Sequence, residues 1–206
     1  MYIPHRYRNE NLQEVRAFIE QNSFGILVSQ QATGPTATHI PLELGKNEDG
    51  KEILTGHIAR ANPQWKNFVD QQRVLAIFSG PHSYISSSWY NHENVPTWNY
   101  IAVHIYGTIK IIEGERVVAM LSELVRKYEA GSAKPVSVES MTPAFLQSQV
   151  KGIVAFEIEI EEIQAAYKLS QNRDAVNHKN IISELEKQQD PHAQAIADSM
   201  KKHAAY

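Results

Sequence analysis

The sequence predicts an antiparallel β barrel with peripheral helices, a mainly β protein of the α+β kind. Six or seven strand-like segments occur in the 206 residues, and short turns join most of them. Helices stand between only some of these segments, so the strict alternation of strand and helix that marks a parallel sheet is absent. Hydrophobic residues make up 42% and charged residues 21% of the chain, which is ordinary for a globular protein.

The N-terminal segments are predicted to form one helix followed by a hairpin. Residues 11–21 carry apolar side chains at helical spacing. Asn11 and Glu14 have the spacing of a capping box, with Asn in place of the usual Ser or Thr. Two strands, at 24–29 and 34–44, follow with a turn-rich gap between them, and this pattern indicates a hairpin.

The middle of the chain combines strands with one helix start. Pro41 cannot donate to a ladder, so its strand should have an edge or a bulge there. After a turn at 47–51 comes a strand at 52–59. A helix should then begin at Asn62-Pro63, with Asn62 as the N-cap and Pro63 at the first helical position.

The second half should form strands and helices in alternating groups, and Gly107 indicates a bulge or a close backbone approach. The expected segments are a strand at 73–80, a loop at 81–97, a strand at 98–112, a helix within 113–131, a short helix opened by Thr142-Pro143, a strand at 152–163 continued by 165–170, and helices at 175–187 and 191–203. We expect a barrel domain over 1–170, with the helices of 171–206 packed on it.

Composition limits the class of function. The chain has no cysteine, so disulfides, thiolate metal sites and cysteine nucleophiles are excluded. Twenty Lys and Arg against 23 Asp and Glu give a net charge of −3, which argues against a strongly basic nucleic-acid binder. No apolar run approaches the length of a membrane span, and the N-terminus lacks the apolar core of a signal peptide. A cytoplasmic protein is the simplest expectation.

The stretch "GHIARANPQW" at 56–65 is a candidate phosphate site. Arg60 lies between a strand end and a helix start, where free backbone N–H groups and the positive end of the helix dipole point. A guanidinium beside a helix N-terminus suits a phosphate. The alternative is a surface arginine next to an ordinary N-cap. Neither a P-loop nor a GxGxxG sequence is present.

Three further patterns leave alternatives open. The aromatic residues of 80–100 suit either a planar ligand or a dimer interface, and the polar turn at 168–173 suits either a site or a solvated loop. The histidines lack the spacing of metal ligands, so we expect structural roles and no metal site; those near strand ends are His39, His57, His82, His92 and His104. No G-x-S-x-G elbow surrounds the serines at 86–88, so no catalytic residue is assigned.

Six motifs occur in a fixed order: "MYIP", "HIPLEL", "GHIARANPQW", "FSGPHSYISSSWY", "VPTWNYIAVHIYG" and "KLSQNR". With them the sequence resembles the PaiB-type FMN-binding negative transcriptional regulators over essentially its whole length. The resemblance implies a split β barrel related to the pyridoxamine phosphate oxidase flavoproteins. It also implies a homodimer with FMN bound at the subunit interface.

The resemblance further implies roles for particular segments. The phosphate would lie near the strand-to-helix turn at 59–62, the flavin ring along 39–41, and the aromatic segment 97–99 would come from the partner subunit. The implied cofactor-binding residues are His39, Ile40, Pro41, His57, Ala59, Arg60, Asn62, Thr97, Trp98, Asn99, Lys168, Gln171 and Asn172.

The function implied is that of a negative transcriptional regulator of the protease and sporulation type. A flavin-dependent oxidoreductase of the split-barrel class is the alternative. A cofactor-free interaction module is a third, and the presence of Arg60, Asn62, Trp98 and Asn99 argues against it. Direct DNA binding has weak support, because the sequence contains no basic recognition helix.

Overall fold

The structure is a computed structural model that describes residues 1–70 and 72–204, and the chain divides into two compact units. Unit 1 comprises Met1–Asn22, Phe78–His104 and Gln164–Tyr206, and unit 2 comprises Ser23–Ile77 and Ile105–Ile163. The predicted boundary at residue 170 stays a prediction.

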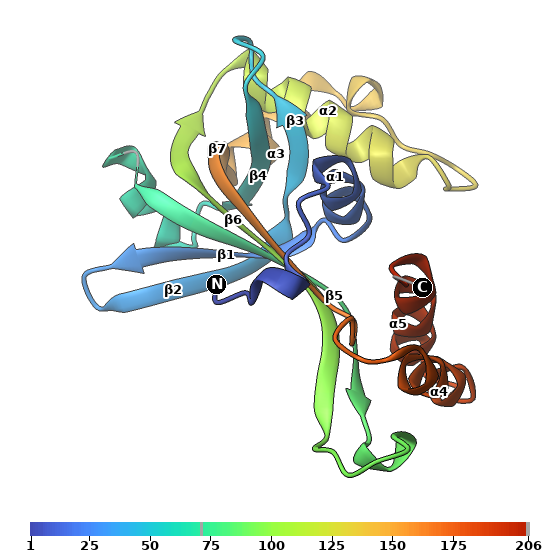
Figure 1. The fold of residues 1–206 in the computed structure, drawn as a ribbon. Coiled ribbons are helices and arrows are strands. Elements are labelled where there is room, and N and C mark those ends of the chain that lie inside the picture. The colour runs from blue at the N-terminus through green and yellow to red at the C-terminus, as the bar shows by residue number, and fades with distance from the viewer. Residues whose placement is uncertain (71, 205–206) are drawn as a thin grey trace. The chain divides into compact units, whose positions relative to one another are not determined.

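The described strands form one seven-stranded sheet with the order β2-β1-β5-β6-β7-β4-β3 (Figure 1). The strands are β1 (Phe24–Gln31), β2 (Gly34–Pro41), β3 (Glu43–Lys46), β4 (Glu52–Ala59), β5 (Arg73–Ile85), β6 (Thr97–Ile112) and β7 (Ile153–Lys168). Every pairing whose register is defined is antiparallel. The mainly β fold class predicted from the turn-linked strands is therefore confirmed.

The two outermost strands of this order, β2 and β3, are separated along the chain by Leu42 alone. The sheet must therefore curl until its two edges approach, as in a barrel. Pro41 pairs with Phe24 of β1, whereas Glu43 pairs with Thr55 of β4. The single strand predicted at 34–44 is thus wrong: it changes partner at Leu42, directly after a proline that cannot donate to the ladder.

Unit 2 adds helices on the outside of these strands. They are η2 (Pro63–Asp70), α2 (Glu115–Glu129), η4 (Val138–Ser140) and α3 (Pro143–Lys151), and η2 is a 3-10 helix rather than an α-helix. Val117 and Met120 of α2 pack on Ile112 and Ala155. Gly107 marks the close approach that its position predicts, because an added Cβ would lie 2.2 Å from the carbonyl oxygen of Glu159.

Unit 1 contains a long hairpin arm and the terminal helices. Its helices are η1 (His5–Tyr7), α1 (Leu12–Gln21), η3 (Ser87–Trp89), α4 (Ala175–Glu186) and α5 (Pro191–Lys202). β5 continues to Ile85, so the loop predicted at 81–97 is too long. Ser83 and Ile85 are buried while Tyr84 is exposed, and this alternation makes the segment a strand. The connection runs from 86 to 96 and contains η3.

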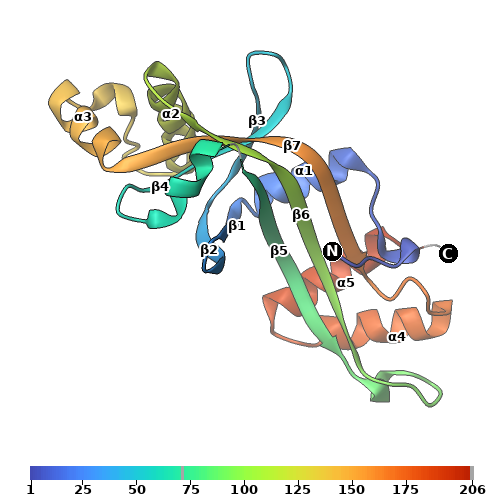
Figure 2. The ribbon, with the colours of Figure 1, turned by 90° about the vertical axis from the view of Figure 1, so that its left-hand side faces the viewer.

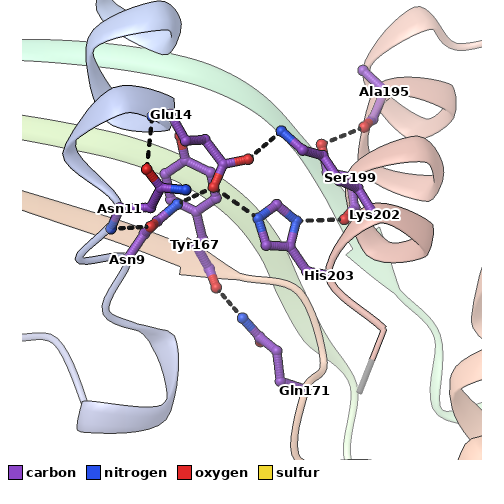
Figure 3. Close-up of polar contacts among 9 residues, drawn as sticks. All are labelled: Asn9, Asn11, Glu14, Tyr167, Gln171, Ala195, Ser199, Lys202 and His203. Atoms are coloured by element: carbon purple, nitrogen blue, oxygen red, sulfur yellow. Dashed lines mark hydrogen bonds and ion pairs between the residues drawn. The ribbon is translucent and has the colours of Figure 1, made fainter. Parts of the chain in front are cut away.

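Glu14 joins α1 to α5 within unit 1 (Figure 3). The Asn11 side chain accepts a hydrogen bond from the Glu14 backbone N–H at 3.2 Å, as a capping box requires. The Glu14 carboxylate does not return the bond: it accepts from Asn9 Nδ2 at 2.7 Å, from His203 Nε2 at 3.1 Å and from Lys202. The predicted capping box is therefore only half formed, because stronger donors on α5 and on Asn9 attract the carboxylate.

The environment of this carboxylate favours its ionised form. Burial acts to raise the pKa of Glu14, but hydrogen bonds from Lys202, Asn9 and His203 outweigh burial and lower the pKa to about 2. The half-buried anion and its donors thus form a polar contact that holds the C-terminal helix on the N-terminal one.

Candidate functional site

The turn that follows β4 is tied to β2 by side-chain hydrogen bonds. Asn62 Nδ2 donates to Thr38 Oγ1 at 2.9 Å, and Thr38 Oγ1 donates to Gln64 Oε1 at 2.5 Å. Asn62 Oδ1 accepts from the Gln64 backbone N–H at 3.0 Å, so Asn62 caps the first turn of η2 as predicted. These contacts bring together two segments, 38–41 and 59–62, that lie about 20 residues apart in the sequence.

Gln64 anchors this turn and was not found by the sequence analysis. Its side chain is fully buried, and Nε2 donates to Leu27 O at 3.1 Å and to Ser29 Oγ at 3.0 Å. A buried amide with all of these partners fixes the turn on β1 and β2. The only sequence signal was its place directly after the Asn62-Pro63 helix start, and this does not distinguish a buried glutamine from an exposed one.

Arg60 is exposed and held in a defined position. Its Nε donates to Lys151 O at 2.8 Å, and Nη2 donates to Ile153 O at 2.7 Å. The guanidinium also lies 5.9 Å from the ring centroid of Trp65. A guanidinium has five N–H donors, so the hydrogen bonds found in the described chain leave three of them to meet an anion. Arg60 thus combines a structural contact with the capacity that a phosphate contact needs.

β2, which contains the segment 38–41, lies at an edge of the sheet. β2 pairs with β1 only, so one side of its backbone is not engaged by another strand of the described sheet. His39 is exposed and stacks on Phe24, with ring centroids 6.3 Å apart, whereas Ile40 is buried. An edge of this kind offers backbone donors and acceptors to a flat polar ligand.

Pro41 and His57 line a common hollow of about 160 Å³ beside α2. His57 is half-buried, and burial lowers the pKa of its imidazole below the ordinary value, so the ring is neutral at pH 7. Among the expected residues of unit 2, Asn62 bonds to Thr38, which directly precedes His39, and Pro41 and His57 line the same hollow.

The expected residues of unit 1 form a second group around the end of β7. Lys168 Nζ donates to Thr97 Oγ1 at 2.5 Å, and Ser170 Oγ donates to Asn99 Oδ1 at 3.0 Å. Burial lowers the pKa of Lys168, with the nearby Arg173 charge as a second cause. Trp98 points to the opposite face, because side chains alternate along a strand, and it is 53% exposed.

Gln171 and Asn172 belong to the turn after β7. Gln171 Oε1 accepts from the Leu169 backbone N–H at 2.8 Å, and its Nε2 donates to Tyr167 O (Figure 3). Asn172 Oδ1 accepts from Tyr7 Oη at 3.3 Å. Ser170 has a φ of 60°, in the left-handed region. The polar residues of this turn thus stabilise the turn itself, and their contact with a ligand stays a prediction.

Within residues 1–70 and 72–204, no group of three or more His, Cys, Asp or Glu side chains is arranged to hold a metal ion. None of the helices that the structure describes is both long enough and apolar enough to span a membrane.

The chain is similar to known proteins over nearly its whole length. The profile of a family described as "Putative FMN-binding domain" matches residues 1–162. The chain is 45% identical over 201 residues to "Protease synthase and sporulation protein PAI 2" of Bacillus subtilis, covering 98% of this chain and 97% of that protein. It is 29% identical over 170 residues to "Uncharacterized protein YKL070W" of Saccharomyces cerevisiae, covering 70% of this chain and all of that protein.

Solved structures share the fold. The "FAD and Heme binding protein" of Mycobacterium smegmatis superposes with a TM-score of 0.61 at 13% identity, covering 84% of this chain and 78% of that one. The "Flavocytochrome Anf3" of Azotobacter vinelandii gives 0.56 at 18% identity, covering 79% and 70%. The expected split antiparallel β barrel is thereby confirmed, and a flavin is supported as the type of ligand. The chain belongs to the family described as "Putative FMN-binding domain".

Proposed function

We propose that this protein binds FMN as a homodimer and acts as a negative regulator of gene expression. The observation that carries the proposal is the Asn62–Thr38 hydrogen bond, because it joins the Arg60 turn to the 39–41 strand. These are the two segments to which the family motifs assign the phosphate and the flavin ring. The high identity to the Bacillus subtilis sporulation protein supports the same role.

The residues present suit the chemistry of FMN. The free donors of Arg60 would receive the phosphate through charge-assisted hydrogen bonds. The edge of β2 near His39 would receive the polar rim of the ring, and neutral His57 would offer a donor or an acceptor without adding charge. When bound, the flavin would supply one- or two-electron redox chemistry.

Exposed aromatic side chains support the homodimer. Trp98 and Tyr84 are 53% and 47% exposed, and their rings meet edge to face with centroids 5.9 Å apart. Large exposed rings are typical of interfaces. In the proposed dimer the segment at 97–99 of one subunit would cover the flavin held by the other, giving two equivalent sites.

Regulation would act through a partner protein or through the flavin rather than by direct high-affinity contact with DNA. The net charge is −3, whereas specific DNA binding usually neutralises several phosphates with clustered Lys and Arg. The most basic stretch, 200–203, lies at the end of α5, where Lys202 already contacts Glu14.

The test is to compare FMN with riboflavin, which lacks the phosphate, in the Arg60→Ala variant. A charge-assisted hydrogen bond contributes about 1.5–3 kcal/mol, so FMN should bind about 10- to 150-fold more weakly. The affinity for riboflavin should fall far less. Because Arg60 also holds Lys151 O and Ile153 O, the ratio of the two losses, rather than either loss alone, measures phosphate recognition.

Arg73→Ala is the matched control, since Arg73 is an exposed arginine of unit 2 that pairs with Glu161. It should leave both affinities unchanged. Equal losses of FMN and riboflavin in Arg60→Ala would show that Arg60 does not bind the phosphate, and the proposed site would then be wrong.

A further inference from the structure

Two hollows lie within unit 1, each lined by residues of the β5–β6 hairpin and of the C-terminal segment. The first, of about 470 Å³, is lined by residues 88–91 and by Asn180, Ser183 and Glu184. The second, of about 300 Å³, is lined by His82, Ser83, Tyr84, Trp98, Gln188, Asp190 and His192. Trp89 lines both hollows, so they meet at its ring.

One face of α4 lines the first hollow. Asn180, Ser183 and Glu184 have the spacing i, i+3 and i+4, which places them on one face of α4, and Gln188 follows in the turn after the helix ends at Glu186. The η3 turn that carries Trp89 packs against α4 at the tip of the β5–β6 hairpin (Figures 1 and 2). We call the two joined hollows the α4 groove.

One half of the α4 groove is aromatic. The His82 ring lies 4.7 Å from that of His192 and 6.1 Å from that of Trp98. Such rings stack on planar heterocycles. Gln188 and Asp190 add groups that can hydrogen-bond the edge of a base, since an amide matches N6 and N7 of adenine and a carboxylate accepts from an exocyclic amine.

The other half is rich in amide, hydroxyl and carboxylate groups. Asn180 and Ser183 are exposed to the hollow, and Glu184 is half-buried. Tyr90 also lines this half: it is 8% exposed, and its hydroxyl has no hydrogen-bond partner among the described residues. A buried hydroxyl without a partner is costly unless a ligand or water meets it. A carboxylate beside such groups is how proteins commonly hold a ribose diol.

The charges along the groove disfavour a phosphate. The described residues that line it include the carboxylates of Glu184 and Asp190 but no lysine or arginine, and Lys187 beside it is already paired with Glu184 at 2.5 Å. We propose that the α4 groove binds a purine nucleoside, with the base in the aromatic half and the ribose against Asn180, Ser183 and Glu184. The polar half shares no residue with the proposed FMN contacts; Trp98 alone belongs to both.

The test is calorimetric titration of the full chain with adenosine, AMP and riboflavin. Adenosine should bind, and AMP should bind about tenfold more weakly, because no lysine or arginine lines the groove to receive its phosphate and Lys187 is already paired with Glu184. Asn180→Ala and Ser183→Ala should each weaken adenosine about 3- to 10-fold, as expected for one lost hydrogen bond. Lys179→Gln changes an exposed residue of α4 that lines neither hollow, so it should have no effect.

Absence of saturable adenosine binding up to about 10 mM would overturn the inference. Equal or tighter binding of AMP, or adenosine binding that both alanine variants leave intact, would do the same. If riboflavin displaces adenosine, and the same variants weaken the binding of riboflavin, the groove is a flavin site instead. FMN affinity should be unchanged in Asn180→Ala, so the outcome is independent of the test at Arg60.

Discussion

Replacing Glu14 by glutamine should weaken the contact between α1 and α5 in a pH-dependent way. A pKa lowered from 4.5 to about 2 corresponds to about 3 kcal/mol of folding free energy as an upper limit. The Glu14 side chain is only 15% exposed, but its partner Lys202 is 68% exposed. Solvent screening of that partner reduces the expected contribution to about 1–2 kcal/mol.

The direction of the pH effect follows from the sign of the shift. Because the pKa of Glu14 is lower in the folded state than in the unfolded chain, its contribution is fully present above about pH 4.5. It is lost as the pH falls from there to about 2. Glu14→Gln should therefore be less stable than the wild type at pH 7, and the two should converge in acid.

Urea and thermal unfolding at pH 7 and in steps down to acid pH would measure the effect. A loss of about 1–2 kcal/mol should lower Tm by about 2–8 °C in a chain of this size. Glu10→Gln is the control, because Glu10 is an exposed carboxylate next to the same helix, 4.0 Å from Arg8, and should change stability little. Equal stability of wild type and Glu14→Gln at pH 7, or a deficit that persists unchanged in acid, would refute the reasoning.

Three other predictions concern packing, assembly and DNA. Gly107→Ala should lower the free energy of unfolding by about 3 kcal/mol, because its Cβ would meet the Glu159 carbonyl. Gly45→Ala is the control, because nothing lies within 4 Å of a Cβ added there, and similar Tm values for the two variants would contradict the prediction. Light scattering of the protein saturated with FMN should give twice the 23.3 kDa chain mass, and a monomer at micromolar concentration would contradict the proposed dimer. Gel shifts should show weak, non-specific DNA binding that disappears near physiological salt, and nanomolar sequence-specific binding there would contradict this prediction.

Local signals predicted the elements whose ends are set by nearby residues. The strand at 52–59 has the bounds expected from its flanking turn, and Asn62 and Thr142 cap their helices. Asp190-Pro191 opens α5 as predicted. In each case the turn or cap chemistry is encoded within a few residues, so sequence pattern and structure agree.

Features that depend on distant partners were not predictable in this way. Leu42 separates two strands because its neighbours pair with different strands, and Glu14 leaves its capping box for donors on α5. At the candidate site, sequence motifs named Asn62 but not the buried Gln64 that anchors the same turn. They also grouped Trp98 with Asn99, although strand alternation sends the two side chains to opposite faces.

The central claim is that the chain binds FMN and recognises its phosphate. Titration of the purified full-length protein with FMN and riboflavin, followed by flavin absorbance and fluorescence, tests it most directly. We predict saturation at one FMN per chain, with riboflavin bound more weakly by about 10-fold or more, as one charge-assisted phosphate contact requires. Failure of FMN to saturate the protein, or equal affinity for FMN and riboflavin, would contradict the account.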